Sequence, residues 1–269
     1  MKRITLIICT LLISSALLAQ DSTSYSPYYQ QNNSKAAKRA RVNNLLRMEE
    51  EGDLIFNRHW LLGFRLATDG YGVFYEKGIF KTNTRTVLYQ LELNEKKSPK
   101  DHKVAAAGYN GIDYSSVVVG KLNNFYQFKV AIGQQHLIGG KGNKNGVAVT
   151  YLYSGGLSLG FVKPYYVDVN DPSTGNNFRS KYPTIIDSGY IELGASGFTV
   201  GWNKVTLDPG LNAKLALRFD YGRFNQSISA IEAGVTGEYY VTEVPMLYLV
   251  PYKHFFFNAY VSIMFGKRK

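Results

Sequence analysis

A two-residue alternation of apolar and polar side chains runs through most of the chain from His59 to its end. The clearest run is 211–224, where large apolar or alanine side chains at the odd positions from 211 to 221 alternate with polar or small residues at the even positions from 212 to 222. The final run, 255–265, repeats this pattern with Phe255, Phe257 and Phe265 on its apolar face. Because successive side chains of a strand point to opposite faces, a period of two predicts β-strands. We therefore expect an all-β fold.

The same pattern predicts about twelve antiparallel strands. They are expected to begin near Trp60, Tyr71, Thr84, Tyr114, Phe125, Gly146, Leu157, Tyr190, Phe198, Leu211, Ile228 and Phe255. An even number returns both termini to the same side of a membrane, as bacterial outer-membrane barrels require. Ten strands are the alternative, because the two strands between 190 and 205 have the weakest alternation.

Turn residues and segment lengths predict which connections share a side of the membrane. Short periplasmic turns are expected at 123–124 and 155–156, where pairs of asparagines or glycines interrupt the pattern. Longer extracellular loops are expected at 95–113, 135–146 and 166–189.

Alternation alone does not say which face is buried, since a soluble β-sandwich also alternates. Two features favour a transmembrane β-barrel over 58–269 in the bacterial outer membrane. The polar faces are rich in glycine and small residues, as a crowded lumen requires, and aromatic residues make up 14% of the chain and cluster near strand ends. A soluble sandwich remains the alternative.

The first 19 residues have the layout of a secretory signal peptide. Lys2 and Arg3 precede an apolar run over 4–18, and Ala19 offers a small residue for cleavage. The one cysteine, Cys9, lies inside this run, so the exported chain would have neither a disulfide nor thiolate chemistry. Removing two of 31 basic residues and none of the 20 acidic ones leaves a net charge of 29 − 20 = +9.

Residues 20–57 are predicted to form a periplasmic linker followed by a basic helix. The segment 22–33 is rich in Ser, Tyr, Asn and Gln, and Ser34 can cap a helix that runs from Lys35 to about Glu51. This basic arm is a candidate contact for a partner or for lipid, through Lys38, Arg39 and Arg41. In an exported chain the positive charge favours membrane lipid or an envelope protein as partner, not nucleic acid.

Nine charged residues are predicted to point into the barrel lumen. They are Arg65, Glu76, Glu92, Lys129, Lys214, Arg218, Asp220, Glu232 and Glu238. Charges in so narrow a space must pair or reach water. Two interpretations follow: an ion-pair network that fills the lumen, or a charged narrow pore for ions or small solutes. The signs are nearly balanced, which favours the network.

Other candidate chemistry is weak. The loop 133–146 combines glycine with lysine, but Ile138 stands where a phosphate-binding Walker motif needs glycine, so Lys141 and Lys144 are predicted only to contact a partner or lipopolysaccharide. Four scattered histidines, of which His102 and His136 fall on predicted extracellular loops, form no metal-binding or nucleophile motif. No enzyme and no cofactor is expected, and a surface lipid-modifying enzyme is the remaining alternative.

Four segments give the barrel region a resemblance to a known group. These are 69–75 (DGYGVFY), 133–136 (GQQH), 218–224 (RFDYGRF) and 255–260 (FFFNAY). In architecture and style the region 59–269 resembles the small outer-membrane barrels of Bacteroidota, some of which, of the PorT and PorG kind, take part in type IX secretion. The resemblance implies a barrel that serves as a structural or docking component of an envelope assembly or protein secretion machine, and it carries over no catalytic residue.

Overall fold

The structure is a computed structural model that describes residues 35–40, 56–106, 116–141, 146–182, 184–186, 188–222, 226–248 and 250–269. The chain divides into two units, 1–55 and 56–269. In the first unit, residues 35–40 are helical and exposed. The expected signal peptide, and the remainder of the expected basic helix, lie outside the described residues.

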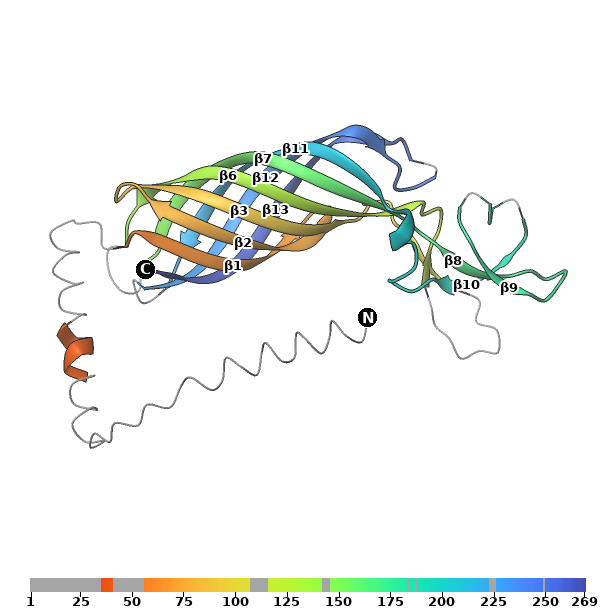
Figure 1. The fold of residues 1–269 in the computed structure, drawn as a ribbon, viewed down its shortest axis with the longest axis horizontal. Coiled ribbons are helices and arrows are strands. Elements are labelled where there is room, and N and C mark those ends of the chain that lie inside the picture. Colours follow the sequence, from red (N-terminus) through yellow and green to blue (C-terminus); the bar gives the residue numbers. More distant parts are fainter. Residues whose placement is uncertain are drawn as a thin grey trace, which may run out of the picture. The chain divides into compact units, whose positions relative to one another are not determined.

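The second unit is built on a closed barrel of eight antiparallel strands (Figure 1). In order around the barrel they are β1 (Arg58–Ala67), β2 (Gly70–Phe80), β3 (Arg85–Lys96), β6 (Asn123–Gly139), β7 (Ala148–Pro164), β11 (Thr206–Asp220), β12 (Ser227–Val244) and β13 (Lys253–Arg268). Each strand pairs with the next, and β1 pairs with β13 to close the ring. Closure leaves the barrel without a free sheet edge.

Smaller elements occupy the long connections between barrel strands. A three-stranded sheet in the order β10-β8-β9 contains β8 (Val167–Asn170), β9 (Asn177–Ser180) and β10 (Ile191–Ala195). A two-stranded sheet joins β4 (Lys103–Ala105) to β5 (Ser116–Val118). The 3-10 helix η1 (Trp202–Lys204) leads into β11.

The prediction of twelve strands, or of ten, is wrong for the barrel. The strands expected near Gly146 and Leu157 are one continuous strand, β7. Gly156 is not in a turn: a Cβ atom there would lie 2.0 Å from the backbone oxygen of Val130, so the glycine permits close approach of β6. Asn123 and Asn124 likewise begin β6 and form no turn.

The other surplus strands belong to the connections. The strand expected near Tyr114 corresponds to β5, and the strand expected near Tyr190 corresponds to β10, both in small sheets outside the barrel. No barrel strand begins near Phe198, where turns lead into η1.

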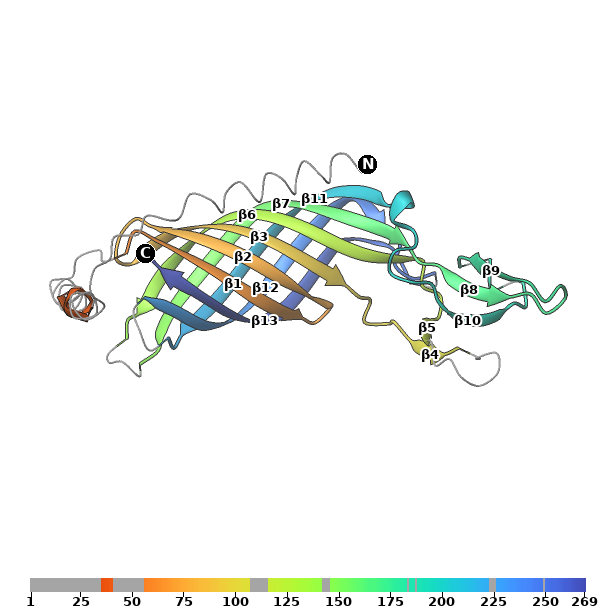
Figure 2. The ribbon, with the colours of Figure 1, turned by 60° about the horizontal axis from the view of Figure 1, so that its bottom comes forward.

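The two ends of the barrel carry connections of different length. The described parts of 81–84, 140–147 and 221–226 lie at the end that holds the start of β1 and the C-terminus, where the Lys269 amide donates to the Arg58 carbonyl oxygen at 2.8 Å. The described parts of the longer segments 97–122 and 165–205 lie at the opposite end, together with 68–69 and those of 245–252 (Figures 1 and 2). The predicted grouping of 135–146 with the other long loops is therefore wrong.

The surface of the barrel is apolar, and its interior holds buried charged side chains beside apolar ones such as Leu88 and Leu152. Leu211, Leu215 and Phe257 are 59%, 56% and 66% exposed, whereas Glu76 and Glu232 are 0% exposed. A water-soluble sandwich has the reverse distribution, so this barrel has the surface of one that lies in lipid. Among the described residues, no helix has both the length and the apolar character needed to cross a membrane.

Candidate functional site

The alternation of each strand turns all nine predicted lumen residues toward the barrel interior. They are between 0% and 6% exposed and come from six strands, namely β1 (Arg65), β2 (Glu76), β3 (Glu92), β6 (Lys129), β11 (Lys214, Arg218, Asp220) and β12 (Glu232, Glu238). The structure divides them among three clusters of ion pairs along the barrel.

Arg218 organises the central cluster, which comprises Arg65, Glu76, Glu92, Lys214, Arg218 and Glu232. Its Nη1 and Nη2 atoms donate to the two carboxylate oxygens of Glu76, both at 2.7 Å. Its Nε and Nη2 atoms donate to Oε2 of Glu232 at 2.9 and 2.7 Å. The planar guanidinium thus joins β11 to β2 across the lumen and to the neighbouring β12, a geometry that a lysine could not reproduce.

The remaining members close the central cluster around Glu92. Arg65 donates to one oxygen of Glu92 at 2.6 Å and Lys214 donates to the other at 3.1 Å. The Arg65 guanidinium also lies 4.1 Å from the ring centroid of Tyr260, whose hydroxyl donates to Glu232 at 2.7 Å. Each buried carboxylate therefore has more than one donor, as burial of charge requires.

The rim cluster lies nearer the long connections and comprises Asp69, Lys96, Lys129 and Glu238. Glu238 accepts from Lys129, from Lys96 at 3.1 Å and from the Gln127 amide at 2.8 Å. Lys96 also pairs with Asp69, in the turn between β1 and β2. Sequence reasoning missed Lys96, although it shares a strand face with Glu92, and missed Asp69, because a turn residue carries no alternation.

The terminal cluster lies at the opposite end and comprises Lys141, Asp220 and Arg268. Asp220 pairs with Arg268 and, at 3.3 Å, with Lys141. Lys141 also donates to the carbonyl oxygen of Gly222 at 2.6 Å, so its ammonium is bound to the barrel itself. Lys144, the other predicted contact in this loop, lies outside the described residues, as does Arg41, whereas Lys38 and Arg39 lie in the exposed helical segment 35–40.

The space between the central and rim clusters is small. A cavity of about 20 Å³ is lined by residues that include Arg65, Gln127, Lys129 and Glu238. It has room for about one water molecule. The Gln127 Oε1 and Arg65 Nη2 atoms are buried without a hydrogen-bond partner among the described residues, and both residues line this cavity.

The histidines do not form a common site. His102 lies just before β4, in a long connection, whereas His136 lies in β6 near the other end and stacks on Tyr151 at 5.0 Å. The prediction that both occupy extracellular loops is wrong for His136, because β6 extends past it. Among the described residues, no group of three or more His, Cys, Asp or Glu side chains could hold a metal ion.

The long connections pack together into a folded region. We call the described parts of 97–122, 165–205 and 245–252 the loop platform. Its buried apolar core is formed by Val117, Val118, Tyr165, Val167, Val169, Tyr182, Ile185 and Leu247. The Tyr165 hydroxyl accepts from the Val118 amide at 3.2 Å, and Lys121 pairs with Asp101 at 3.0 Å. Burial raises the pKa of Tyr182, and so does the hydrogen bond that its hydroxyl donates to Glu192.

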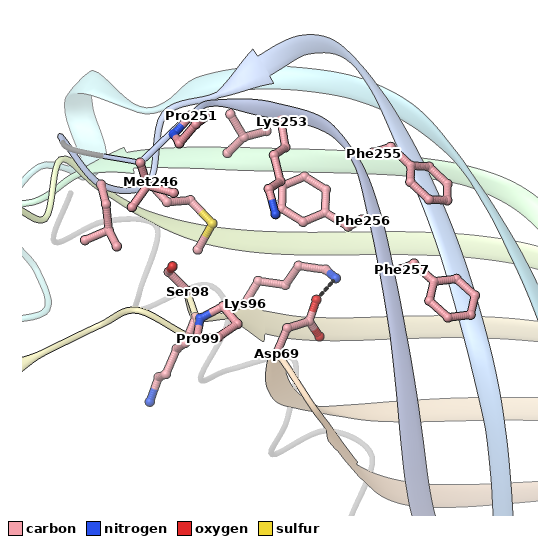
Figure 3. Close-up of a pocket in the computed structure, with 14 residues that line it drawn as sticks. Asp69, Lys96, Ser98, Pro99, Met246, Pro251, Lys253, Phe255, Phe256 and Phe257 are labelled. Carbon is pink, nitrogen blue, oxygen red and sulfur yellow. Dashed lines mark hydrogen bonds and ion pairs between the residues drawn. The ribbon is translucent and has the colours of Figure 1, made fainter.

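A pocket of about 140 Å³ lies where the loop platform meets the barrel (Figure 3). We call it the mouth pocket. It lies between the turn at Asp69, the end of β3 at Lys96, and the β12–β13 connection with the start of β13. The Asp69–Lys96 ion pair belongs both to this pocket and to the lining of the small lumen cavity. The pair therefore separates the mouth pocket from the lumen.

Comparisons with known proteins give only distant matches. No protein-family model matches the chain, and no curated protein matches its sequence. Among solved structures, Neisserial surface protein A matches at 8% identity and a TM-score of 0.38, over 79% of this chain and 96% of that one. Ail, the attachment invasion locus protein of Yersinia pestis, matches at 9% identity and a TM-score of 0.36, over 79% and 97%.

A third solved structure is the N-terminal β-barrel domain of Pseudomonas aeruginosa OprF. It matches at 13% identity and a TM-score of 0.35, over 78% of this chain and 98% of that one. Superpositions at this level assign neither a family nor a function to the chain.

Proposed function

We propose that this chain is a non-enzymatic outer-membrane barrel that serves as a docking component at the cell surface. The apolar exterior and the buried charges of the interior suit a barrel in lipid. In bacterial barrels the short turns face the periplasm and the long loops face outward. With this orientation the terminal cluster lies on the periplasmic side and the loop platform lies outside the cell.

The loop platform carries this proposal. Loops that only connect strands run over the surface with little core of their own, whereas this region has eight buried apolar residues and two small sheets. A folded platform on a barrel whose lumen holds three ion-pair clusters favours binding by the loops over passage through the lumen. Phe178 and Ile186, which are 40% and 50% exposed, are available on it for contact with a partner.

The partner is proposed to be an envelope protein, in an assembly or secretion machine. The basic arm is proposed as a second docking element on the periplasmic side, since Lys38 and Arg39 are exposed. Charge reversal at Lys38, Arg39 and Arg41 should then weaken recovery of a periplasmic partner. Unchanged recovery would remove the arm from the proposal and leave the loop platform in it.

Purification from native outer membranes in mild detergent, followed by mass spectrometry, tests the docking role. We expect a stoichiometric partner to be recovered with the intact chain. It should be lost when 167–195, which contains β8, β9 and β10, is replaced by a short glycine-serine turn. Heat-modifiable migration on gels would show that the barrel of the variant still folds. Recovery of no partner, or of the same partner with both chains, would contradict docking by the platform.

A further inference from the structure

The mouth pocket combines apolar walls with positive charge. Its apolar lining includes Pro99, Met246, Val250 and Phe256. The pocket is smaller than the roughly 300–1,000 Å³ of a pocket for a drug-sized ligand, so a fitting ligand is small. Figure 3 shows Pro99, Met246 and Phe256 around one space; Phe255 and Phe257 of β13 also belong to the lining, although their rings point away from Phe256. Phe255 and Phe257 are 57% and 66% exposed and belong to the apolar surface of the barrel.

Four charged side chains line the pocket: three lysines and one aspartate. Lys96 is paired with two carboxylates, Asp69 and Glu238, so Lys96 adds no unbalanced positive charge to the pocket. Lys97 lies with its ammonium 4.8 Å from the ring centroid of Tyr71, a residue that does not line the pocket. Lys253 is exposed and has no ion-pair partner among the described residues, and its side chain extends toward Phe256 in Figure 3.

We propose that the mouth pocket binds a free alkyl carboxylate, with its carboxylate on Lys253 and its chain against Met246 and Phe256. An unpaired ammonium beside apolar walls is complementary to a ligand with one negative end and an apolar body. A neutral alkyl chain would leave the ammonium to water alone, and a fully polar anion would leave the apolar walls unused. The site is separate from the docking role proposed above and does not depend on it.

Methyl NMR of the barrel in lipid nanodiscs, with [¹³C-methyl]methionine and hexanoate as the probe, tests the site. The chain has four methionines. Met246 lines the pocket, whereas Met264 is fully buried inside the barrel and serves as an internal control. We expect hexanoate to shift the Met246 methyl signal saturably and to leave the Met264 signal unchanged. Hexanol, which has the same chain but no charge, should give no saturable shift.

Lys253→Gln should weaken hexanoate binding about tenfold, the effect of one partly exposed charge-assisted contact. Lys100→Gln provides the matched control, because Lys100 is an exposed lysine of the same end of the barrel and does not line the pocket. An unchanged Met264 signal would show that each variant is folded. Equal shifts with hexanol and hexanoate, equal affinity in Lys253→Gln, or no shift at all would overturn the proposal.

Discussion

Replacing Arg218 by glutamine should destabilise the barrel much more than breaking an exposed ion pair. Arg218 makes four hydrogen bonds to two carboxylates, Glu76 and Glu232, and both of these side chains are 0% exposed. The substitution keeps a polar side chain but removes the charge that both carboxylates share. Two buried anions would then lose their principal partner.

The magnitude follows from the contacts that would remain. Removing one member of a buried ion pair costs about 3–5 kcal/mol, because an uncompensated charge is left in the interior. Glu76 would retain His59 at 3.1 Å and the Gln90 amide. Glu232 would retain the Tyr260 hydroxyl at 2.7 Å and the more distant cations Arg65 and Lys214 at 3.8 and 4.0 Å. These neutral or distant partners offset part of the loss, so we expect a cost of about 3 kcal/mol, at the lower end of that range.

Urea unfolding in phospholipid vesicles, followed by tryptophan fluorescence, measures this cost. Arg179→Gln is the matched control, because Arg179 pairs with Asp168 at 3.1 Å with both side chains largely exposed. That pair should contribute at most about 1 kcal/mol. A second substitution, Glu76→Gln in the Arg218→Gln background, should recover part of the loss. If Arg218→Gln costs no more than the control, the lumen charges are hydrated and the filled-lumen account is refuted.

Three further predictions test the barrel and the platform. Gly156→Ala should cost about 1–3 kcal/mol of stability through overpacking, because its Cβ would meet the adjacent backbone. Gly139→Ala, where a Cβ would have no atom within 4 Å, should be neutral in the same unfolding assay. Equal effects of the two substitutions would argue against close packing at Gly156. Leu215→Lys on the lipid face should cost about 2–4 kcal/mol, and Ile186→Lys on the platform less than about 0.5 kcal/mol; a harmless Leu215→Lys would place that face in water. The pKa of the Tyr182 phenol is raised above its ordinary value of about 10. The stability that this shift contributes is therefore complete below about pH 10 and is lost as the pH rises through the folded-state pKa. In Tyr182→Phe, tyrosinate absorbance should show one fewer tyrosine that ionises at high pH, and titration curves identical to the wild type would contradict this.

The alternation of side chains predicted the all-β class and the face of each lumen residue. Charged side chains at every second position, such as Lys214 and Arg218 in β11, share one face whatever the number of strands. The orientation of these residues could therefore be predicted although the strand count was wrong. Their partners could not, because Arg218 meets Glu76 across 142 positions of sequence and only barrel closure brings them together.

The predicted strand count was wrong because the same sequence features occur in two different structural settings. The Gly155–Gly156 pair resembles a hairpin turn, yet both residues lie within β7, and Gly156 permits the neighbouring strand β6 to approach closely. The runs near Tyr114 and Tyr190 do form short strands, β5 and β10, but these pair within the loop platform. Local alternation does not show which sheet a strand joins. The platform core and the mouth pocket depend on contacts between distant connections, so no short segment predicted them.

Single-channel recording of the purified chain in planar lipid bilayers shows whether the lumen is closed to ions. The central, rim and terminal clusters occupy the lumen at three levels, so we predict stable insertion without steady unitary conductance. Insertion should be verified by heat-modifiable migration of the same sample. A reproducible unitary current carried by the wild-type chain would contradict the sealed lumen and would favour a narrow pore for ions or small solutes.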